Sequence, residues 1–126
     1  MGWIKRPVRT GWHDASELLS NGWTGKVYLA RSGDIVMLRL HAVSAASATT
    51  GEILTLPLGL RPSTLGVSVE RPLLHTTAPV IRRGYFAGAT RATLTVTGYT
   101  AADQLYGDIR FDTTDAPPVT VPGVKL

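Results

Sequence analysis

The sequence predicts an all-β fold: an antiparallel, jelly-roll-like β-sandwich with one short helix and extended N- and C-terminal arms. Short stretches of alternating apolar and polar residues recur along the chain, with turn residues between them about every 8–12 residues. The segment 56–62 (LPLGLRP) is too rich in proline and glycine for a helix or a central strand. With 126 residues, the chain is long enough for one domain with its own core. We place this domain at residues 11–114, between arms at residues 1–10 and 115–126.

The first ten residues show neither helical nor alternating periodicity. They nevertheless carry large apolar side chains next to basic ones, which an isolated solvated tail would not normally have. We therefore expect an extended arm that contacts a partner through Trp3, Ile4, Lys5, Arg6 and Arg9. The alternative is an N-terminal edge strand that packs on its own domain.

One helix is predicted within residues 11–22. Asp14 followed by Glu17 resembles a capping box, and residues 15–20 would then form about two helical turns. The dipeptide Asn21-Gly22 is a typical C-terminal stop. Because so short a helix is marginally stable alone, we expect flanking tryptophans to pin it across one end of the sandwich.

From residue 26 onward the pattern alternates with a period of two. Strands are predicted at 26–31 and 35–41, joined by a hairpin turn at 32–34 (Ser-Gly-Asp). The side chains that this pattern turns inward are Val27, Leu29, Val36, Leu38 and Leu40. The same reasoning predicts further strands at residues 52–56, 65–70, 80–86, 92–97 and 104–112, with Arg71-Pro72 closing the strand at 65–70.

The segment 56–62 forms the predicted structural corner of the fold. Pro57 and Pro62 each fix φ and lack an amide donor, while Gly59 permits a turn that a Cβ would resist. We expect a crossing between two sheets, with the leucines of the segment pointing into the core. Arg61 would donate its fork of hydrogen bonds to carbonyl groups at strand ends. A ligand-binding role and an intersubunit contact are the alternatives for this arginine.

Composition limits the classes of partner. Charged residues make up 17% of the chain, below the roughly 25% that is usual for soluble domains, so part of the surface is expected to be covered by partners. No apolar run approaches the ~18 residues of a membrane span. The net charge is +4, but the basic cluster at the N-terminus is short and lacks interleaved aromatic residues. We therefore expect a protein partner and neither nucleic acid nor membrane.

The residues that could carry chemistry are scattered. The three histidines lie in separate segments without metal-ligand spacing, the nine acidic residues form no paired-carboxylate motif, and cysteine is absent. We therefore predict no catalytic residues, no metal site and no cofactor. Aromatic residues suggest one alternative site, a platform on which a glycan would stack, formed by Trp12, Trp23 and Tyr85.

A series of motifs runs along the chain: Gly11-Trp12 with Asp14, Leu18-Leu19, Asn21-Gly22-Trp23, Arg31-x-Gly33-Asp34-x-Val36 and Leu56-Pro57-x-Gly59-x-Arg61-Pro62. This series resembles a C-terminal module of minor tail and fibre proteins from phages of actinobacteria, and the segment 80–85 resembles the strand–glycine–strand stretch of that module. The resemblance covers roughly residues 11–111. The corner of the module usually reads Leu-Pro-x-Gly-Phe-Arg-Pro, with Leu60 replacing the phenylalanine here. The resemblance implies a trimeric β-sandwich on a virion surface, without enzymatic activity.

The short segment before the module favours one role among those that the resemblance implies. In tail fibres the module follows a long shaft, whereas here about ten residues precede it. We therefore expect a homotrimeric capsid-decorating protein on the virion surface that binds the major capsid protein through its arms, Val119 and Val121 included. The alternative is a tail protein that contacts other tail proteins and recognises a host-surface glycan.

Overall fold

A computed structural model gives the structure of residues 9–46, 51–63, 70–75, 80–87, 92–97, 104–116 and 121–126. Within these ranges most residues lie in β-strands, and the one helical element is a single turn of 3₁₀ helix, η1, at Ser16–Leu18. The predicted all-β class is therefore confirmed. The strands are β1 (His13–Asp14), β2 (Trp23–Ser32), β3 (Ile35–Ala45), β4 (Glu52–Thr55), β5 (Glu70–His75), β6 (Val80–Ala87), β7 (Thr93–Val96), β8 (Leu105–Asp112) and β9 (Val124–Lys125).

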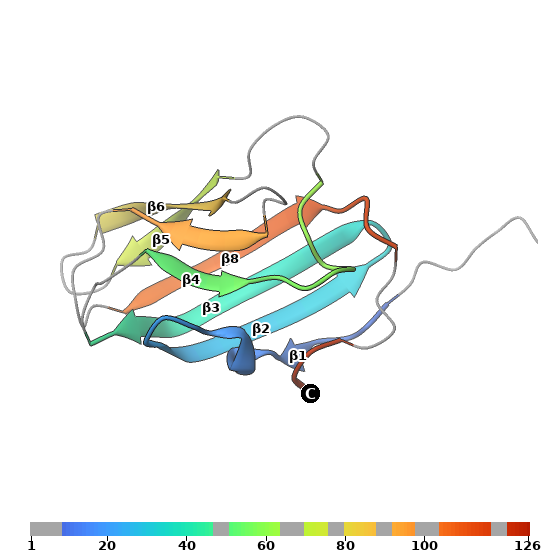
Figure 1. Ribbon diagram of the computed structural model, residues 1–126, viewed down its shortest axis with the longest axis horizontal. Coiled ribbons are helices and arrows are strands. Elements are labelled where there is room, and N and C mark those ends of the chain that lie inside the picture. The colour runs from blue at the N-terminus through green and yellow to red at the C-terminus, as the bar shows by residue number, and fades with distance from the viewer. Residues whose placement is uncertain are drawn as a thin grey trace, which may run out of the picture.

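All nine strands belong to one antiparallel ladder in the order β4-β7-β6-β5-β8-β3-β2-β1-β9. The sheet folds over on itself, so that β4 and β7 form a layer in front of β2, β3 and β8 in a sandwich-like arrangement (Figure 1). The order β8-β5-β6-β7 is a Greek key, in which the fourth strand returns beside the first. A bridge between Leu19 and Leu54 ties the β4 edge back to the segment that follows η1.

The core lies between the two layers. In the β2–β3 hairpin, every side chain that alternation turns inward is buried, which confirms the predicted face of both strands. The two-residue turn begins with Gly33 at a φ of +58°, a value that favours glycine. Across the core the rings of Phe86 on β6 and Phe111 on β8 meet edge to face, with centroids 5.1 Å apart.

The helix at residues 15–20 is much shorter than the sequence predicts. Sheet pairing takes over the start of that segment, since β1 pairs with β2 and the Ala15 amide donates to the Val27 carbonyl at 2.8 Å. Asp14 does accept the Ser16 amide, at 3.1 Å. Glu17 makes no capping box; its carboxylate accepts the amide of Gly123 at 2.6 Å instead. Only three residues remain helical.

The prediction that Arg71-Pro72 closes a strand is wrong, because Pro72 lies inside β5. The strand pairs with β6 over its whole length but with β8 only at Leu74 and His75. At Pro72 the strand therefore has one neighbour, an edge-like position where a missing amide donor is tolerated. The first part of that predicted strand, residues 65–69, lies outside the described residues.

Both end segments contact their own domain where the structure describes them. Arg9 is exposed and bridges Ser32, and the Thr10 amide donates to the Arg31 carbonyl at 3.0 Å. At the other end β9 pairs with β1, so the C-terminus lies beside that strand (Figure 1). Val121 packs against the core cluster.

The prediction of a free C-terminal arm is therefore wrong for residues 121–126, whereas the contact of Val121 with a partner stays a prediction. The open edge of β1 supplies the backbone partners, and Gly123 approaches the Asp14 carbonyl so closely that a Cβ would not fit. Trp3, Ile4, Lys5, Arg6 and Val119 lie outside the described residues. No helix among the described residues is both long and apolar enough to span a membrane.

Candidate functional site

The proline corner, residues 56–62, crosses from one layer to the other, as predicted. At its start the Leu56 amide donates to the carbonyl of Ala92, just before β7, at 2.8 Å. Just after its end, the Ser63 amide donates to Asp112, the last residue of β8, also at 2.8 Å. The crossing is therefore anchored on both layers.

The leucines of the corner do not all point inward. Leu56 and Leu60 are buried, but Leu58 is 70% exposed, which corrects the expectation for that residue. The Leu60 amide donates to the Pro57 carbonyl at 3.2 Å and closes a β-turn with Leu58 at its apex. Gly59 has a φ of +99° at the turn position that requires a positive value. A turn interrupts the alternation on which the prediction rested.

Arg31, at the end of β2, is the buried arginine of this region, with 2% of its surface exposed. Its Nε donates to the Gly33 carbonyl at 2.8 Å, and its Nη1 donates to Gly59 at 2.6 Å. The same Nη1 reaches Ala116 at 3.2 Å, while Nη2 donates to the Asp115 carbonyl at 2.9 Å. One guanidinium thus joins the hairpin turn, the corner and the segment after β8.

Arg61 has a different partner from the strand-end carbonyls expected for it. Its Nε and Nη2 form a bidentate ion pair with Asp115, at 3.0 and 2.9 Å. The same carboxylate accepts the amides of Gly59 and Arg61 at 3.0 and 3.1 Å. The side chain of Arg61, followed by these amides, holds the pKa of Asp115 below its usual value. We call Arg31, Arg61, Asp115 and the corner the corner clasp.

The sequence contains a signal for Arg31 that the prediction overlooked. Alternation places residue 31 on the same face as Val27 and Leu29, which are both buried. An arginine on the inward face of a strand requires hydrogen-bond partners inside the protein. The carbonyl role predicted for Arg61 therefore belongs to Arg31.

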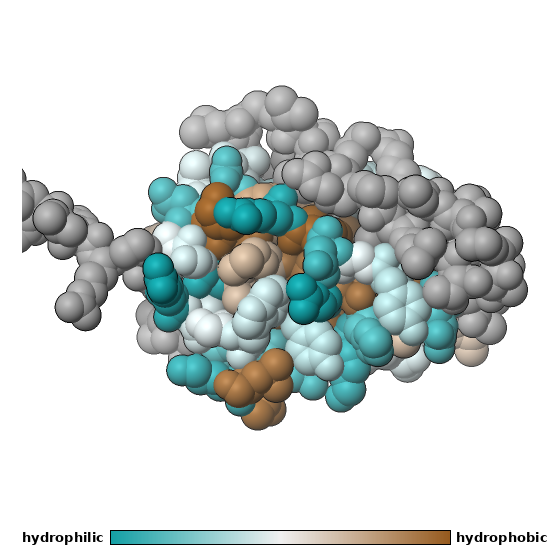
Figure 2. Space-filling view, turned by 180° about the vertical axis from the view of Figure 1, so that it is seen from behind, coloured by the Kyte–Doolittle hydropathy of each residue, from teal (hydrophilic) through white to brown (hydrophobic). Residues whose placement is uncertain are grey.

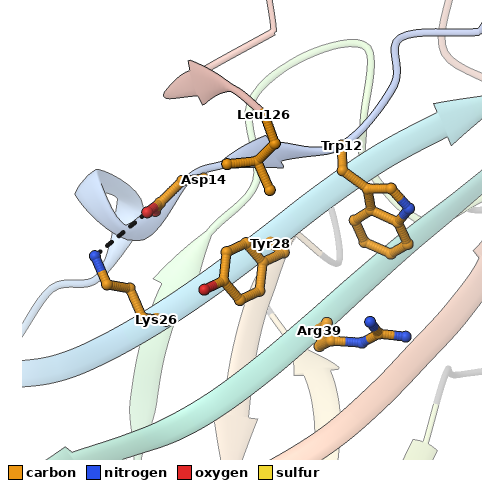
Figure 3. Close-up of a pocket in the computed structure, with 6 residues that line it drawn as sticks. All are labelled: Trp12, Asp14, Lys26, Tyr28, Arg39 and Leu126. Carbon is orange, nitrogen blue, oxygen red and sulfur yellow. Dashed lines mark hydrogen bonds and ion pairs between the residues drawn. The ribbon is translucent and has the colours of Figure 1, made fainter.

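A second feature lies on the outer side of β1, β2 and β3. It is an open groove of about 630 Å³, and we call it the outer groove (Figure 3). Tyr28 lies in the middle of it, with Lys26 and Asp14 on one side and Trp12 and Arg39 on the other. The residues that line it are Trp12, Asp14, Lys26, Tyr28, Arg39 and Leu126.

Each cation of the outer groove is paired with a carboxylate. Arg39 makes a bidentate ion pair with Asp108 on β8, at 2.8 and 3.1 Å, and this raises the pKa of the arginine. The guanidinium also stacks on Trp12, with its Cζ 5.2 Å from the ring centroid. Lys26 Nζ lies 3.3 Å from Asp14 Oδ2. The pKa of Asp14 is lowered, chiefly by the hydroxyl and amide of Ser16.

A smaller hollow of about 170 Å³, lined by residues of β3 and β8, lies next to the outer groove. Trp12 and Arg39 line both hollows, and Asp108 lines the smaller one. Seen from behind, the molecule carries hydrophilic and pale residues around scattered hydrophobic ones (Figure 2). The face is therefore not one broad apolar patch.

The predicted platform of Trp12, Trp23 and Tyr85 is not assembled. Trp23 is 4% exposed and belongs to the core, while Tyr85 alternates with buried Gly84 and Phe86 on β6, away from the groove. Trp12 shares the groove with Tyr28, which the alternation of β2 places on the face opposite to Val27 and Leu29. Among the residues that the structure describes, no group of histidine, aspartate and glutamate side chains is suited to hold a metal ion.

Comparison with known proteins finds no counterpart. A scan against protein-family models, a search of curated proteins and a search of solved structures each returned no match to this chain. A functional assignment therefore rests on the residues and contacts described above.

Proposed function

We propose that the protein is a non-enzymatic structural protein of a bacteriophage virion. In this proposal it is a homotrimer that binds the major capsid protein and reinforces the lattice from outside. One observation supports it most: two phage-module motifs far apart in the sequence meet in the corner clasp. Arg31 donates to Gly33 within its own motif and to Gly59 in the other, and its Nη2 lies 3.9 Å from Asp34. If the chain has the fold of that module, motifs that are distant in the sequence are expected to contact each other in this way.

The lattice contact is assigned to the N-terminal segment. Residues 9 and 10 are attached beside the end of β2, next to the β2–β3 turn. Trp3 and Ile4 would supply apolar contacts, while Lys5 and Arg6 would pair with acidic groups on the capsid. Residues 121–126 are a weaker choice for this contact, because β9 pairs with β1 and Val121 packs against the core cluster of its own domain.

Capsid binding tests this proposal directly. Purified protein added to undecorated capsids should occupy regular lattice positions by electron microscopy and raise the temperature at which the capsids break. The double variant Trp3→Ala/Ile4→Ala should lose binding. Val124→Ala, which truncates an exposed apolar side chain on β9, is the matched control and should bind normally. Binding to tail tips alone, or to no part of the particle, would exclude the decorating role.

The trimer is a separate part of the proposal. Light scattering should give a particle of three 13.5 kDa chains at micromolar concentration. A stable monomer in solution, together with monomeric occupancy of the lattice, would remove the trimer and leave the decorating role open to its own test.

The outer groove favours a second candidate function, a tail-tip protein that recognises a host-surface glycan. Trp12 and Tyr28 supply aromatic surface next to hydrogen-bonding ion pairs. Labelling of the particle separates the two candidates, because the decorating protein would lie on the head and the tip protein on the tail.

A further inference from the structure

We propose that the outer groove binds a neutral, polyhydroxylated ligand, namely the pyranose units of an oligosaccharide. This goes beyond the decorating role, which does not need the groove, and it gives the second candidate function a defined site. The inference rests on four features of the groove: its aromatic faces, its spare hydrogen-bonding groups, its balance of charge and its shape.

The aromatic faces come from Tyr28 and Trp12. Tyr28 is half-buried in the middle of β2, so its ring is held in place while one side remains accessible. The Trp12 ring lies beside it along the groove (Figure 3). An aromatic face carries negative charge density, and the C–H bonds on one side of a pyranose ring are weakly positive. Two neighbouring rings therefore suit sugar units that stack in succession.

The hydrogen-bonding groups flank these rings on both sides. Lys26 has three donors, of which one bonds Asp14. Arg39 uses Nε and Nη2 for Asp108, which leaves Nη1 available. Among the described residues, the Tyr28 hydroxyl has no hydrogen-bond partner. A sugar hydroxyl both donates and accepts, so it can bridge the cation and the carboxylate of one ion pair.

The balance of charge selects a neutral ligand. Lys26 is paired with Asp14, and Arg39 is paired with Asp108, so the two cations next to the rings are already compensated. A phosphate or uronate group entering the groove would meet a carboxylate beside each cation. Nucleic acid requires basic side chains that are free to pair with phosphates. A neutral sugar chain needs no such uncompensated charge.

The shape favours more than one sugar unit. A volume of about 630 Å³ lies within the range of roughly 300–1,000 Å³ that is usual for small-molecule sites. The smaller hollow next to the outer groove adds a second place for a ring. Because Trp12 and Arg39 line both hollows, one extended ligand could use them together. We infer an oligosaccharide rather than a single sugar.

Titration of the full chain with defined hexasaccharides tests this inference. The neutral probes are cellohexaose, maltohexaose and mannohexaose, and the charged probe is hexagalacturonate. At least one neutral probe should bind at or below about 10 mM, and hexagalacturonate should bind more weakly. Binding is followed by the change in tryptophan fluorescence and by calorimetry.

Two tyrosines provide matched variants. Tyr28→Ala should raise the Kd at least about tenfold, because it removes the central ring. Tyr106→Ala, which removes a half-buried tyrosine on β8 that contacts His41, should leave the Kd unchanged. Lys26→Ala alters an exposed side chain, so it gives a second test that does not depend on the ring, and it should also weaken binding.

Three outcomes would overturn the inference: no neutral probe binds, hexagalacturonate binds more tightly than every neutral probe, or Tyr106→Ala weakens binding as much as Tyr28→Ala. None of these outcomes affects the decorating role, because capsid binding is measured without saccharide. Conversely, failure to bind capsids would leave the saccharide result intact.

Discussion

The corner clasp and the outer groove both pair arginine with aspartate, but they differ in how deeply the arginines lie. Arg31 is 2% exposed and donates to four backbone carbonyls, whereas the side chain of Arg39 is 52% exposed and contacts side chains alone. A buried charge must find all its partners inside the protein, so its position is determined by the fold. An exposed ion pair contributes little to stability and can exchange a contact for a ligand. The same two residue types therefore form a buried structural contact in one place and an accessible surface pair in the other, where we propose that a ligand binds.

The two regions also differ in how they are connected. The clasp joins the β2–β3 turn, the crossing between layers and the segment that follows β8, so breaking it loosens three parts of the chain together. The groove lies across the outer side of neighbouring strands whose inner sides form the core. Its side chains can therefore be changed without disturbing the packing beneath them.

The largest effect is expected for Arg31→Met. This variant leaves the carbonyl groups of the clasp without their common donor, and it should lower the free energy of unfolding by about 3–5 kcal/mol. Arg31→Lys should restore little of this loss, since an ammonium group cannot reproduce the planar fork. Urea unfolding followed by circular dichroism measures both variants. A loss below about 1 kcal/mol for Arg31→Met would show that the clasp does not stabilise the fold.

A smaller loss is expected for Leu60→Ala in the corner. Truncating this fully buried side chain should lower the free energy of unfolding by about 2–5 kcal/mol. Leu58→Ala is the control two residues away, and it should leave the unfolding midpoint unchanged because Leu58 lies at the turn apex in solvent. Equal effects of the two variants would mean that the turn does not place Leu60 in the core and Leu58 in solvent.

The next effect concerns Asp115 and depends on pH. Asp115→Asn keeps an acceptor but removes the charge opposite Arg61, and it should cost about 1.5–3 kcal/mol at pH 7. Because the pKa of Asp115 is lowered in the folded state, the unfolded state binds more protons near its own pKa. The stabilisation is therefore complete above the unfolded pKa of about 4, and it is lost as the pH falls through the folded pKa.

The difference in stability between wild type and Asp115→Asn should therefore be full at about pH 6, well above the unfolded pKa of about 4. It should shrink as the pH falls below that value. Urea unfolding over a series of pH values measures it. Other carboxylates with lowered pKa, such as Asp14, act equally in both proteins, so they cancel in the difference. A difference that stays constant with pH would assign the effect to packing and not to charge.

The strand pattern of this chain was predictable wherever alternation was regular. The strands β6, β7 and β8 lie within one residue of their predicted bounds, because period-two burial is a local signal. The hairpin turn between β2 and β3 is where the sequence predicts it, but β2 begins three residues earlier and β3 ends four residues later than predicted. The predicted length of the short helix is too great because β1 pairs with β2. This pairing depends on the tertiary structure and cannot be predicted from capping residues. Pro72 was misinterpreted for a similar reason: whether a strand has one neighbour or two is decided by the topology.

The candidate sites were less predictable, since both are assembled from distant segments. Asp115 was placed in an arm, although its carboxylate closes on Arg61 and the corner. Trp12 and Trp23 look equivalent in sequence, yet one lines the groove and the other lies in the core. Alternation could have identified Arg31 as buried, and it does place Tyr28 on the outward face. It could not have shown which segments would meet them.

The smallest effect on stability is expected for Arg39→Ala. Its ion pair with Asp108 is exposed on both sides, so the urea midpoint should match that of the wild type. The same variant removes the cation that stacks on Trp12 and leaves Asp108 uncompensated, so it should weaken binding of the neutral hexasaccharides. Asp112→Ala, which truncates an exposed carboxylate at the end of β8 away from the groove, is the matched control and should change neither property. If Arg39→Ala destabilised the fold as strongly as Arg31→Met, the outer groove would be part of the architecture, and exposure would no longer separate the two regions.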